Sequence, residues 1–166
     1  MKKGKLSSNM EDYLEAIAFL KKENDVARVR DIGRLLNVQK PSVTSALNTL
    51  SKAGLVLHER YGYVDLTPEG QKIASGVQSR HDMLVKFLTQ ILSVDHETAN
   101  KDACRMEHAI SLPTFQKLTK FMDFVATCPD SATRPDWLKG FDYYFKTGRR
   151  LKCKARKIIQ KSKIGR

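Results

Sequence analysis

Three residues with different donor atoms stand close together near position 105 of the chain. Cys104, Glu107 and His108 offer a thiolate, a carboxylate and an imidazole at positions i, i+3 and i+4. In an α-helix these positions share one face, within an arc of roughly 100°. A mixed sulfur, oxygen and nitrogen set suits a borderline divalent metal such as Fe(II), Co(II), Ni(II) or Zn(II). Because three donors do not fill a coordination shell, the segment predicts a metal site whose other ligands come from elsewhere in the chain.

Two other segments could supply the missing donors. Asp12 and Glu15 lie three residues apart in an expected amphipathic helix, on the side away from its apolar stripe. Together with Glu11 they crowd negative charge, which is unfavourable unless a cation or a basic residue compensates. His81 lies at the edge of the apolar stripe of a later helix. The alternatives are that the acidic residues only stabilise the positive end of a helix and that the histidine only packs.

The composition limits the class of protein. A chain of 166 residues suits one domain or two small ones that share a core. No stretch approaches the roughly 20 apolar residues of a membrane span, and the basic N-terminus leads into an acidic cluster rather than a signal segment. Three cysteines at unrelated spacings argue against a disulfide framework. We therefore expect a cytoplasmic protein with no membrane partner, and we assign no role to Cys128 or Cys153.

The net charge of +12 is concentrated at the two ends of the chain. Residues 146–166 contain ten Lys or Arg and no acid, and Lys2, Lys3 and Lys5 add three more. The remaining residues, 6–145, hold 17 basic and 18 acidic side chains. A basic tail can bind nucleic-acid phosphates without reading sequence, or it can be a solvated extension. We favour phosphate contact, but the charge alone does not establish DNA binding.

The first 70 residues have the pattern of a winged helix-turn-helix. Apolar residues recur with the helical period in three short segments, and Gly54 ends the third of them. Two segments with alternating apolar residues then flank a compact turn, which predicts a β-hairpin. The expected elements are helices at 8–22, 29–36 and 40–50 and strands at 55–60 and 63–66.

The third expected helix has the surface of a DNA-reading helix. Its apolar residues repeat at i, i+3, i+4 and i+7, and its other face carries small polar side chains that suit a major groove. A winged-helix scaffold that only packs against protein is the alternative. We predict DNA contacts from Arg30, Gln39, Lys40, Pro41, Ser42, Thr44, Ser45 and Asn48.

The rest of the chain is expected to be helical. Thr67-Pro68 is a helix-start signal, and the pattern continues to about residue 91. A second helix is expected to run through Ile110, and a third over 114–125. This half has too little mass to bury its own apolar faces, so we expect a symmetric homodimer. The fold class is mainly α, with a winged helix-turn-helix at 1–70, an all-helical metal-binding and dimerisation domain at 71–130 and a basic extension at 131–166.

Three segments resemble the metal-dependent repressors that include the diphtheria toxin repressor and the manganese transport regulator. They are 10–15, Arg80-His81 and 102–108, and the resemblance covers roughly residues 9–124. It implies an Fe(II)- or Mn(II)-dependent repressor of metal-uptake genes, in which metal bridges the DNA-binding and dimerisation domains of a homodimer on a palindromic operator in double-stranded DNA. The metal ligands that the resemblance implies are Asp12, Glu15, His81, Cys104, Glu107 and His108.

The match to this family is mixed in its details. Cys104 looks like the iron-responsive branch, whereas Asp12 with Glu15 looks like the manganese-responsive branch; Co(II), Ni(II) or Zn(II) are possible substitutes in vitro. Asn100 and Val85 stand where a second site of the iron branch has a histidine and a glutamate. We expect the short form, without the SH3-like third domain. The alternative function is a winged-helix regulator not controlled by metal, with a structural metal site or none. An enzyme is not expected, because no candidate base or nucleophile accompanies the donors.

Overall fold

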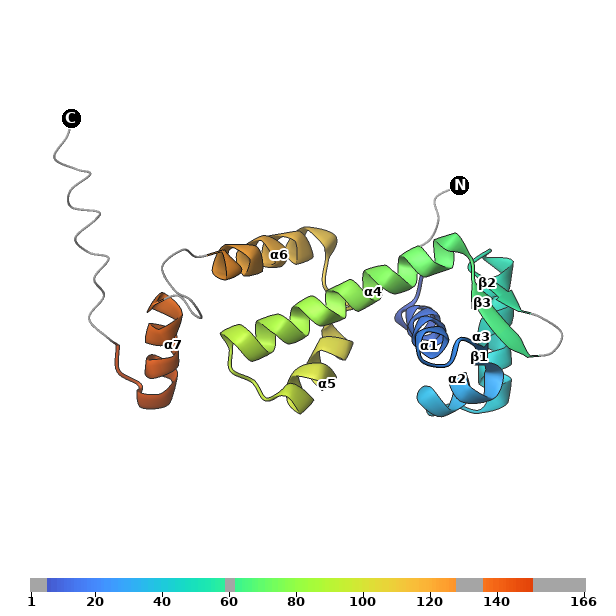
Figure 1. The fold of residues 1–166 in the computed structure, drawn as a ribbon, viewed down its shortest axis with the longest axis horizontal. Coiled ribbons are helices and arrows are strands. Elements are labelled where there is room, and N and C mark those ends of the chain that lie inside the picture. Colours follow the sequence, from blue (N-terminus) through green and yellow to red (C-terminus); the bar gives the residue numbers. More distant parts are fainter. Residues whose placement is uncertain (1–5, 59–61, 128–135, 151–166) are drawn as a thin grey trace, which may run out of the picture. The chain divides into compact units, whose positions relative to one another are not determined.

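The computed structural model describes residues 6–58, 62–127 and 136–150 (Figure 1). Helices dominate these residues, which confirms the mainly α fold class, and the sheet is small and antiparallel with strand order β1-β3-β2. None of the described helices is long and apolar enough to cross a membrane. The elements are α1 (Ser8–Asn24), β1 (Ala27–Arg28), α2 (Val29–Leu35), α3 (Lys40–Lys52), β2 (Val56–His58), β3 (Tyr63–Leu66), α4 (Pro68–Lys86), α5 (His96–Met106), α6 (Leu112–Ala126) and α7 (Asp136–Thr147), with a π-helical segment at Phe87–Ile91.

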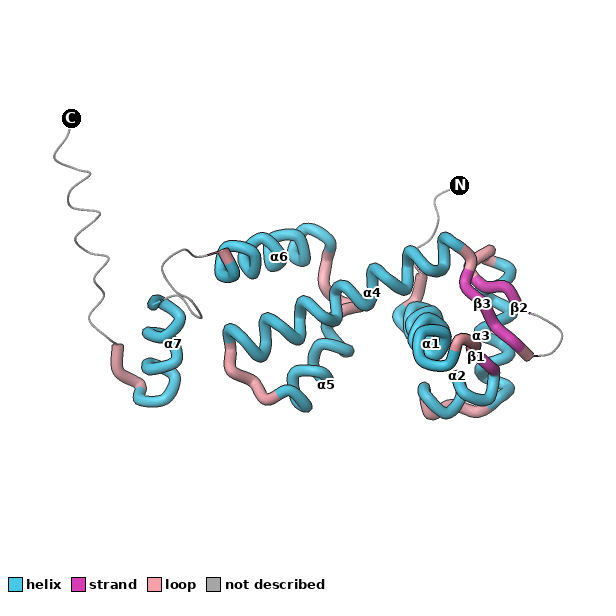
Figure 2. The backbone as a smooth tube through the Cα atoms, viewed as in Figure 1, coloured by secondary structure: helices cyan, strands magenta, loops and turns pink. Residues whose placement is uncertain are grey.

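The elements up to β3 form the expected winged helix-turn-helix (Figure 2). One cluster of buried apolar side chains joins α1, α2 and α3 to the sheet, with Leu14 and Ile17 contributed by α1 and Ile32 by α2. The two-residue strand β1 was not predicted, and it pairs with β3. The apolar stripe expected on α3 is fully buried and consists of Val43, Ala46, Leu47 and Leu50.

The start of α4 is locked onto the chain that enters β2. The amide of Thr67 donates to the Leu55 carbonyl at 3.1 Å, and its hydroxyl donates to the Gly54 carbonyl at 2.8 Å. The amide of Gly70 in turn donates to the Thr67 hydroxyl at 3.1 Å. A Cβ atom at Gly70 would overlap the Leu55 carbonyl oxygen, so only glycine permits this close approach. The helix is therefore fixed to the winged domain at its first turn.

The described residues divide into two compact units. Those within Met1–Lys86 and Asp95–Ile110 form the first, so α5 belongs with the winged helix-turn-helix. In this unit α1 packs against α4, and α4 packs against α5. Those within Phe87–Val94 and Ser111–Arg166 form the second unit.

The second unit leaves apolar side chains exposed in the single chain. The rings of Phe87 and Phe121 meet edge to face at 6.4 Å, but α6 has no buried residue. Leu112 is 67% exposed and Phe124 is 64% exposed. These exposures agree with the expectation that α6 needs a second chain to cover it. The sequence analysis assigned no element to α7, whose Leu138 is buried; Cys128 and Cys153 lie outside the described residues.

Candidate metal centre and DNA-binding surface

The helix that was expected to carry Cys104, Glu107 and His108 is shorter than predicted. It ends at Met106 rather than at Ile110, and Glu107 is its C-cap. The amides of Ala109 and Ile110 both donate to the Met106 carbonyl, at 3.0 and 2.9 Å, so the chain tightens into a turn after Met106. Arg80 Nε of α4 donates to the Glu107 carbonyl at 2.8 Å in this turn. The three donors therefore lie on a helix and on the turn that follows it, not on one helical face.

This turn brings three donor groups together. The ligand atoms of Asp12, Glu107 and His108 all lie within 4.8 Å of one another. His108 Nε2 is 2.8 Å from Asp12 Oδ1 and 3.3 Å from Glu107 Oε1. His81 joins the group through Glu107, because its Nδ1 lies 2.7 Å from Glu107 Oε2. Four of the six predicted ligands thus meet at the junction of α1, α4 and the turn after α5.

Two atoms of this cluster are buried without a hydrogen-bond partner. Glu107 is 1% exposed, and among the described residues it is the one charged side chain that is buried. Its Oε1 and His108 Nε2 accept or donate no hydrogen bond, although they face each other and Asp12. A buried carboxylate oxygen with no partner is costly, and a cation removes that cost. Carboxylate oxygens with imidazole nitrogen are donors that Mn(II) and Fe(II) accept, so these residues fit the metal that the sequence predicts.

Glu15 and Cys104 lie outside this three-residue group, but the negative charge of the group contributes to their pKa shifts. Burial, together with the negative charge of Glu107, raises the pKa of Glu15 to about 7. Partial burial of the thiol and the same carboxylate also raise the pKa of Cys104, a free cysteine. Burial raises the pKa of Glu107 despite its hydrogen bond with His81. For His108, burial alone would lower the pKa, but the Glu11 hydrogen bond and the nearby carboxylates outweigh it and raise the pKa. The metal-free cluster therefore retains protons.

We expect the metal-free protein to lose stability as the pH rises from about 5 to about 8. A folded protein that binds more protons than its unfolded chain has an unfolding free energy that falls with pH, and the raised pKa values of Glu15, Glu107 and His108 all act in this direction. Thermal unfolding at several pH values, in chelator, measures the slope, which should be smaller in Glu15→Gln. Saturating Mn(II) should reverse the slope, because metal and protons compete for the same atoms. Metal-free protein that becomes more stable across this window would contradict the expectation.

Three residues around the cluster were not predicted as part of the site. Glu11 Oε2 accepts from His108 Nδ1 at 2.8 Å and from Arg80 Nη2 at 3.2 Å. Asn100 Oδ1 lies 3.2 Å from His81 Nε2. The sequence did contain one signal for the first pair, because the acidic crowding at Glu11 required a basic partner and Arg80 directly precedes His81. Asn100 has no comparable signal.

The residues predicted to contact DNA form an exposed surface on the winged helix-turn-helix. The hydroxyl of Thr44 donates to the Lys40 carbonyl at 3.1 Å, within the helix. The opposite face of α3 is the buried stripe, which fixes the orientation of the helix. The exposed residues are Arg30, Gln39, Lys40, Pro41, Ser42, Thr44, Ser45 and Asn48.

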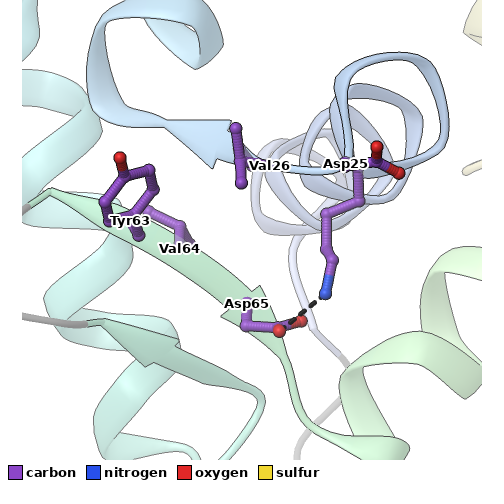
Figure 3. Close-up of a pocket in the computed structure, with 7 residues that line it drawn as sticks. Asp25, Val26, Tyr63, Val64 and Asp65 are labelled. Carbon is purple, nitrogen blue, oxygen red and sulfur yellow. Dashed lines mark hydrogen bonds and ion pairs between the residues drawn. The ribbon is translucent and has the colours of Figure 1, made fainter.

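A separate pocket lies between the end of α1 and β3 (Figure 3). Lys21 Nζ donates to Asp65 Oδ2 across it at 2.6 Å. The pocket shares no residue with the donor cluster. Its Lys21 and Asp65 side chains already neutralise each other. Its lining residues are Lys21, Asp25, Val26, Ala27, Tyr63, Val64 and Asp65.

Two family models cover most of the chain. Residues 5–64 match the N-terminal DNA-binding domain of iron-dependent repressors. Residues 67–136 match the metal-binding and dimerisation domain of the same repressors. The chain belongs to the iron-dependent repressor family. It is therefore a metal-dependent transcriptional regulator of a family that binds DNA and dimerises through its C-terminal domain, and the resemblance stated from the sequence is confirmed.

Individual relatives agree with this family. An HTH-type transcriptional regulator of Methanocaldococcus jannaschii is 34% identical over 71% of this chain and 95% of its own length. The HTH-type transcriptional regulator MntR of Shouchella clausii is 37% identical over 79% of this chain and 89% of its own length. Among solved structures, IdeR of T. acidophilum (28% identity, TM-score 0.63) covers 76% of this chain, and the manganese regulator SloR (28% identity, TM-score 0.63) covers 78%. The chain spans 59% and 60% of the lengths of those two structures.

Proposed function

We propose that this protein is a metal-activated repressor that binds a palindromic operator in double-stranded DNA as a homodimer, with Fe(II) or Mn(II) as its signal. The observation that carries the proposal is the buried carboxylate of Glu107, whose free Oε1 faces the unpartnered Nε2 of His108 beside Asp12. Asp12, Glu107 and His108 would hold the cation, and Glu15, His81 and Cys104 would complete the site.

The ligands are placed so that α1 and α4 respond to the occupancy of the site. Asp12 and Glu15 lie on α1, which also shares the core of the DNA-reading domain, and His81 lies on α4. Without a cation, the ionised forms of the Asp12, Glu15 and Glu107 carboxylates repel one another across these elements, which is one reason why the pKa of Glu15 is raised. A bound divalent cation supplies the positive charge that offsets this repulsion. The packing of α1 against α4 is then firmer, which favours the spacing of two α3 helices that half-sites about 34–36 Å apart require.

The proposal is tested with the purified full-length chain, stripped of metal by a chelator and handled without oxygen. Genomic DNA fragments are bound with no metal, with Fe(II) and with Mn(II), and the retained fragments are sequenced. A metal-activated repressor selects a few palindromic sites upstream of genes only when metal is present, and the more effective ion identifies its signal. Selection of the same sites in chelator would overturn the proposal and favour a regulator that is not controlled by metal.

We expect Cys104→Asp to shift the metal preference of the protein towards Mn(II). A thiolate is a soft ligand that favours Fe(II) over Mn(II), whereas a carboxylate is a hard one. The ratio of the Mn(II) to the Fe(II) affinity should rise roughly tenfold, which corresponds to about 1.4 kcal/mol. Competition titrations against a metal indicator measure both affinities. Cys104→Ala is the control and should weaken both ions. An unchanged ratio in Cys104→Asp would show that the thiol does not bind the metal.

We expect removal of the residues after Phe145 to weaken DNA binding equally for all sequences. The deleted segment carries ten Lys or Arg, and each phosphate contact that is lost lowers the salt dependence of binding by about 0.9 in log–log slope. Affinities for operator and unrelated DNA at several salt concentrations measure the effect. A tail of the same composition in shuffled order should restore it, because the contact depends on charge alone. An unchanged slope would identify the tail as a solvated extension.

A further inference from the structure

Each histidine of the cluster is held at the ring nitrogen that faces away from the other donors. We propose that Glu11 and Asn100 are positioning residues that set opposite tautomers of His108 and His81, so that His108 Nε2 and His81 Nδ1 keep their lone pairs for a cation. The cation in this statement rests on the proposed function, whereas the tautomers are a property of the metal-free chain.

For His108 the holding group is a carboxylate. Glu11 Oε2 lies 2.8 Å from His108 Nδ1 in the geometry of a hydrogen bond, and a carboxylate only accepts. Asp12 Oδ1 lies equally close to Nε2 but not in the geometry of a hydrogen bond, so in the neutral ring Nδ1 carries the hydrogen. Arg80 fixes Glu11, because its Nη2 donates to the same carboxylate at 3.2 Å while its Nε donates to the Glu107 carbonyl at 2.8 Å. The neutral ring then has its lone pair on Nε2, the buried atom that has no hydrogen-bond partner and faces Asp12 and Glu107.

For His81 the holding group is an amide whose orientation is fixed by a third residue. Asn100 Nδ2 donates to the His96 carbonyl at 2.8 Å. Since that carbonyl can only accept, the amide nitrogen must lie on its side, and the amide oxygen faces His81 Nε2 at 3.2 Å. Nε2 therefore carries the hydrogen in His81. Its Nδ1 lies 2.7 Å from Glu107 Oε2, and two acceptors at that distance attract only with a positive charge between them, a proton or a metal ion.

The two histidines differ in which ring nitrogen carries the hydrogen. A neutral histidine in water prefers the hydrogen on Nε2, so His81 has the ordinary tautomer and His108 has the rarer one. Outer-shell groups of this kind fix the ring orientation and raise ligand basicity in metal sites. The two positioning residues come from different elements, Glu11 from α1 and Asn100 from α5. Arg80 of α4 donates both to Glu11 and to the Glu107 carbonyl, and so links Glu11 to the turn after α5.

The test is a long-range ¹H–¹⁵N correlation spectrum of the histidine rings in the full chain. In metal-free protein at about pH 9, where an ordinary histidine is neutral, His108 should carry its hydrogen on Nδ1. With Zn(II) as a diamagnetic probe, His108 should bind through Nε2 and His81 through Nδ1. An Nε2–H tautomer of metal-free His108, or binding of both rings through the same nitrogen, would overturn the inference. The expected tautomer together with no response of either ring to Zn(II) would support the inference and overturn the proposed function.

Substitutions separate positioning from simple packing. Glu11→Ala should return His108 to the Nε2–H tautomer and lower the Zn(II) and Mn(II) affinities by about 10- to 100-fold. Glu11→Gln keeps an accepting oxygen and should keep both the tautomer and most of the affinity. Asn100→Ala should weaken binding similarly and leave His108 unchanged. Glu23→Ala, the same substitution at an exposed residue of α1, is the matched control. A Glu11→Ala variant that loses stability and affinity but keeps the Nδ1–H tautomer would leave Glu11 a structural role only, which overturns the inference.

Discussion

Replacing Glu107 with Gln should abolish the stabilisation of the protein by Mn(II) or Fe(II) while leaving the metal-free protein as stable as before, or more so. Glu107 is 1% exposed, and its Oε1 has no hydrogen-bond partner, so the carboxylate is a burden on the metal-free fold. Glutamine has the same shape without the charge. The metal affinity should fall by more than the 10- to 100-fold that loss of an outer-shell partner costs, because a direct ligand is lost.

Thermal unfolding with and without metal shows both halves of this result in one experiment. Glu97→Gln is the matched control: Glu97 lies in the first turn of α5, the helix that Glu107 caps, but it is exposed and its ion pair is with Lys101. That variant should keep the full rise in melting temperature on addition of metal. A Glu107→Gln protein that metal still stabilises to the native extent would remove Glu107 from the site. One that is unfolded without metal would show that the carboxylate supports the fold instead of burdening it.

Replacing Ser45 with Glu should eliminate operator binding without changing the metal affinity. Ser45 lies on the exposed face of α3, opposite the buried stripe, so the larger side chain is accommodated in the free protein. On DNA, a carboxylate at this position would meet the negative charge of the groove and its phosphates, and each good base contact that it displaces is worth about 1–3 kcal/mol. We therefore expect the operator affinity to fall at least about 100-fold, which corresponds to about 2.7 kcal/mol.

Fluorescence anisotropy with a labelled operator fragment in saturating Mn(II) measures this loss, and an indicator titration measures the metal affinity. Ser75→Glu makes the same charge change at an exposed position of α4 and serves as the control. It should bind the operator nearly as the native protein does. Retained binding by Ser45→Glu would mean that α3 does not read the DNA, and the surface for DNA would have to be sought elsewhere on the winged helix-turn-helix.

The fold was predicted well from the sequence where buried apolar residues repeat with the period of a helix. The stripe of α3 repeats at i, i+3, i+4 and i+7 and is wholly buried, and Thr67 with Pro68 marks the start of α4. The same periodicity could not reveal β1, which has two residues. It also missed α7, because the high positive charge that follows Phe145 gave the whole segment the character of a solvated tail.

The sequence singled out residues that the structure brings together, but it did not predict their geometry. Residue types and spacing were enough to single out Asp12, Glu107 and His108, which the structure brings within 4.8 Å of one another. The end of α5 was misplaced: the helix ends at Met106, and Arg80, which comes from another helix, holds the turn that follows through the Glu107 carbonyl. Contacts between elements that are distant in the chain decide such details, and a sequence pattern reports only on neighbours.

The joint at the start of α4 has a consequence for the design of chimeric regulators. The two family models meet between residues 64 and 67, which makes this the natural place to exchange one DNA-reading domain for another. In the structure, however, this is where Thr67 and Gly70 are locked onto Gly54 and Leu55. A chimera joined at this point would combine a DNA-binding domain and a metal-binding domain whose contact surfaces do not match. Metal binding would then no longer control DNA binding. Exchanging only the exposed residues of α3, between Gln39 and Ala53, while keeping its buried stripe crosses no such joint and should yield new operator specificity with the metal response intact.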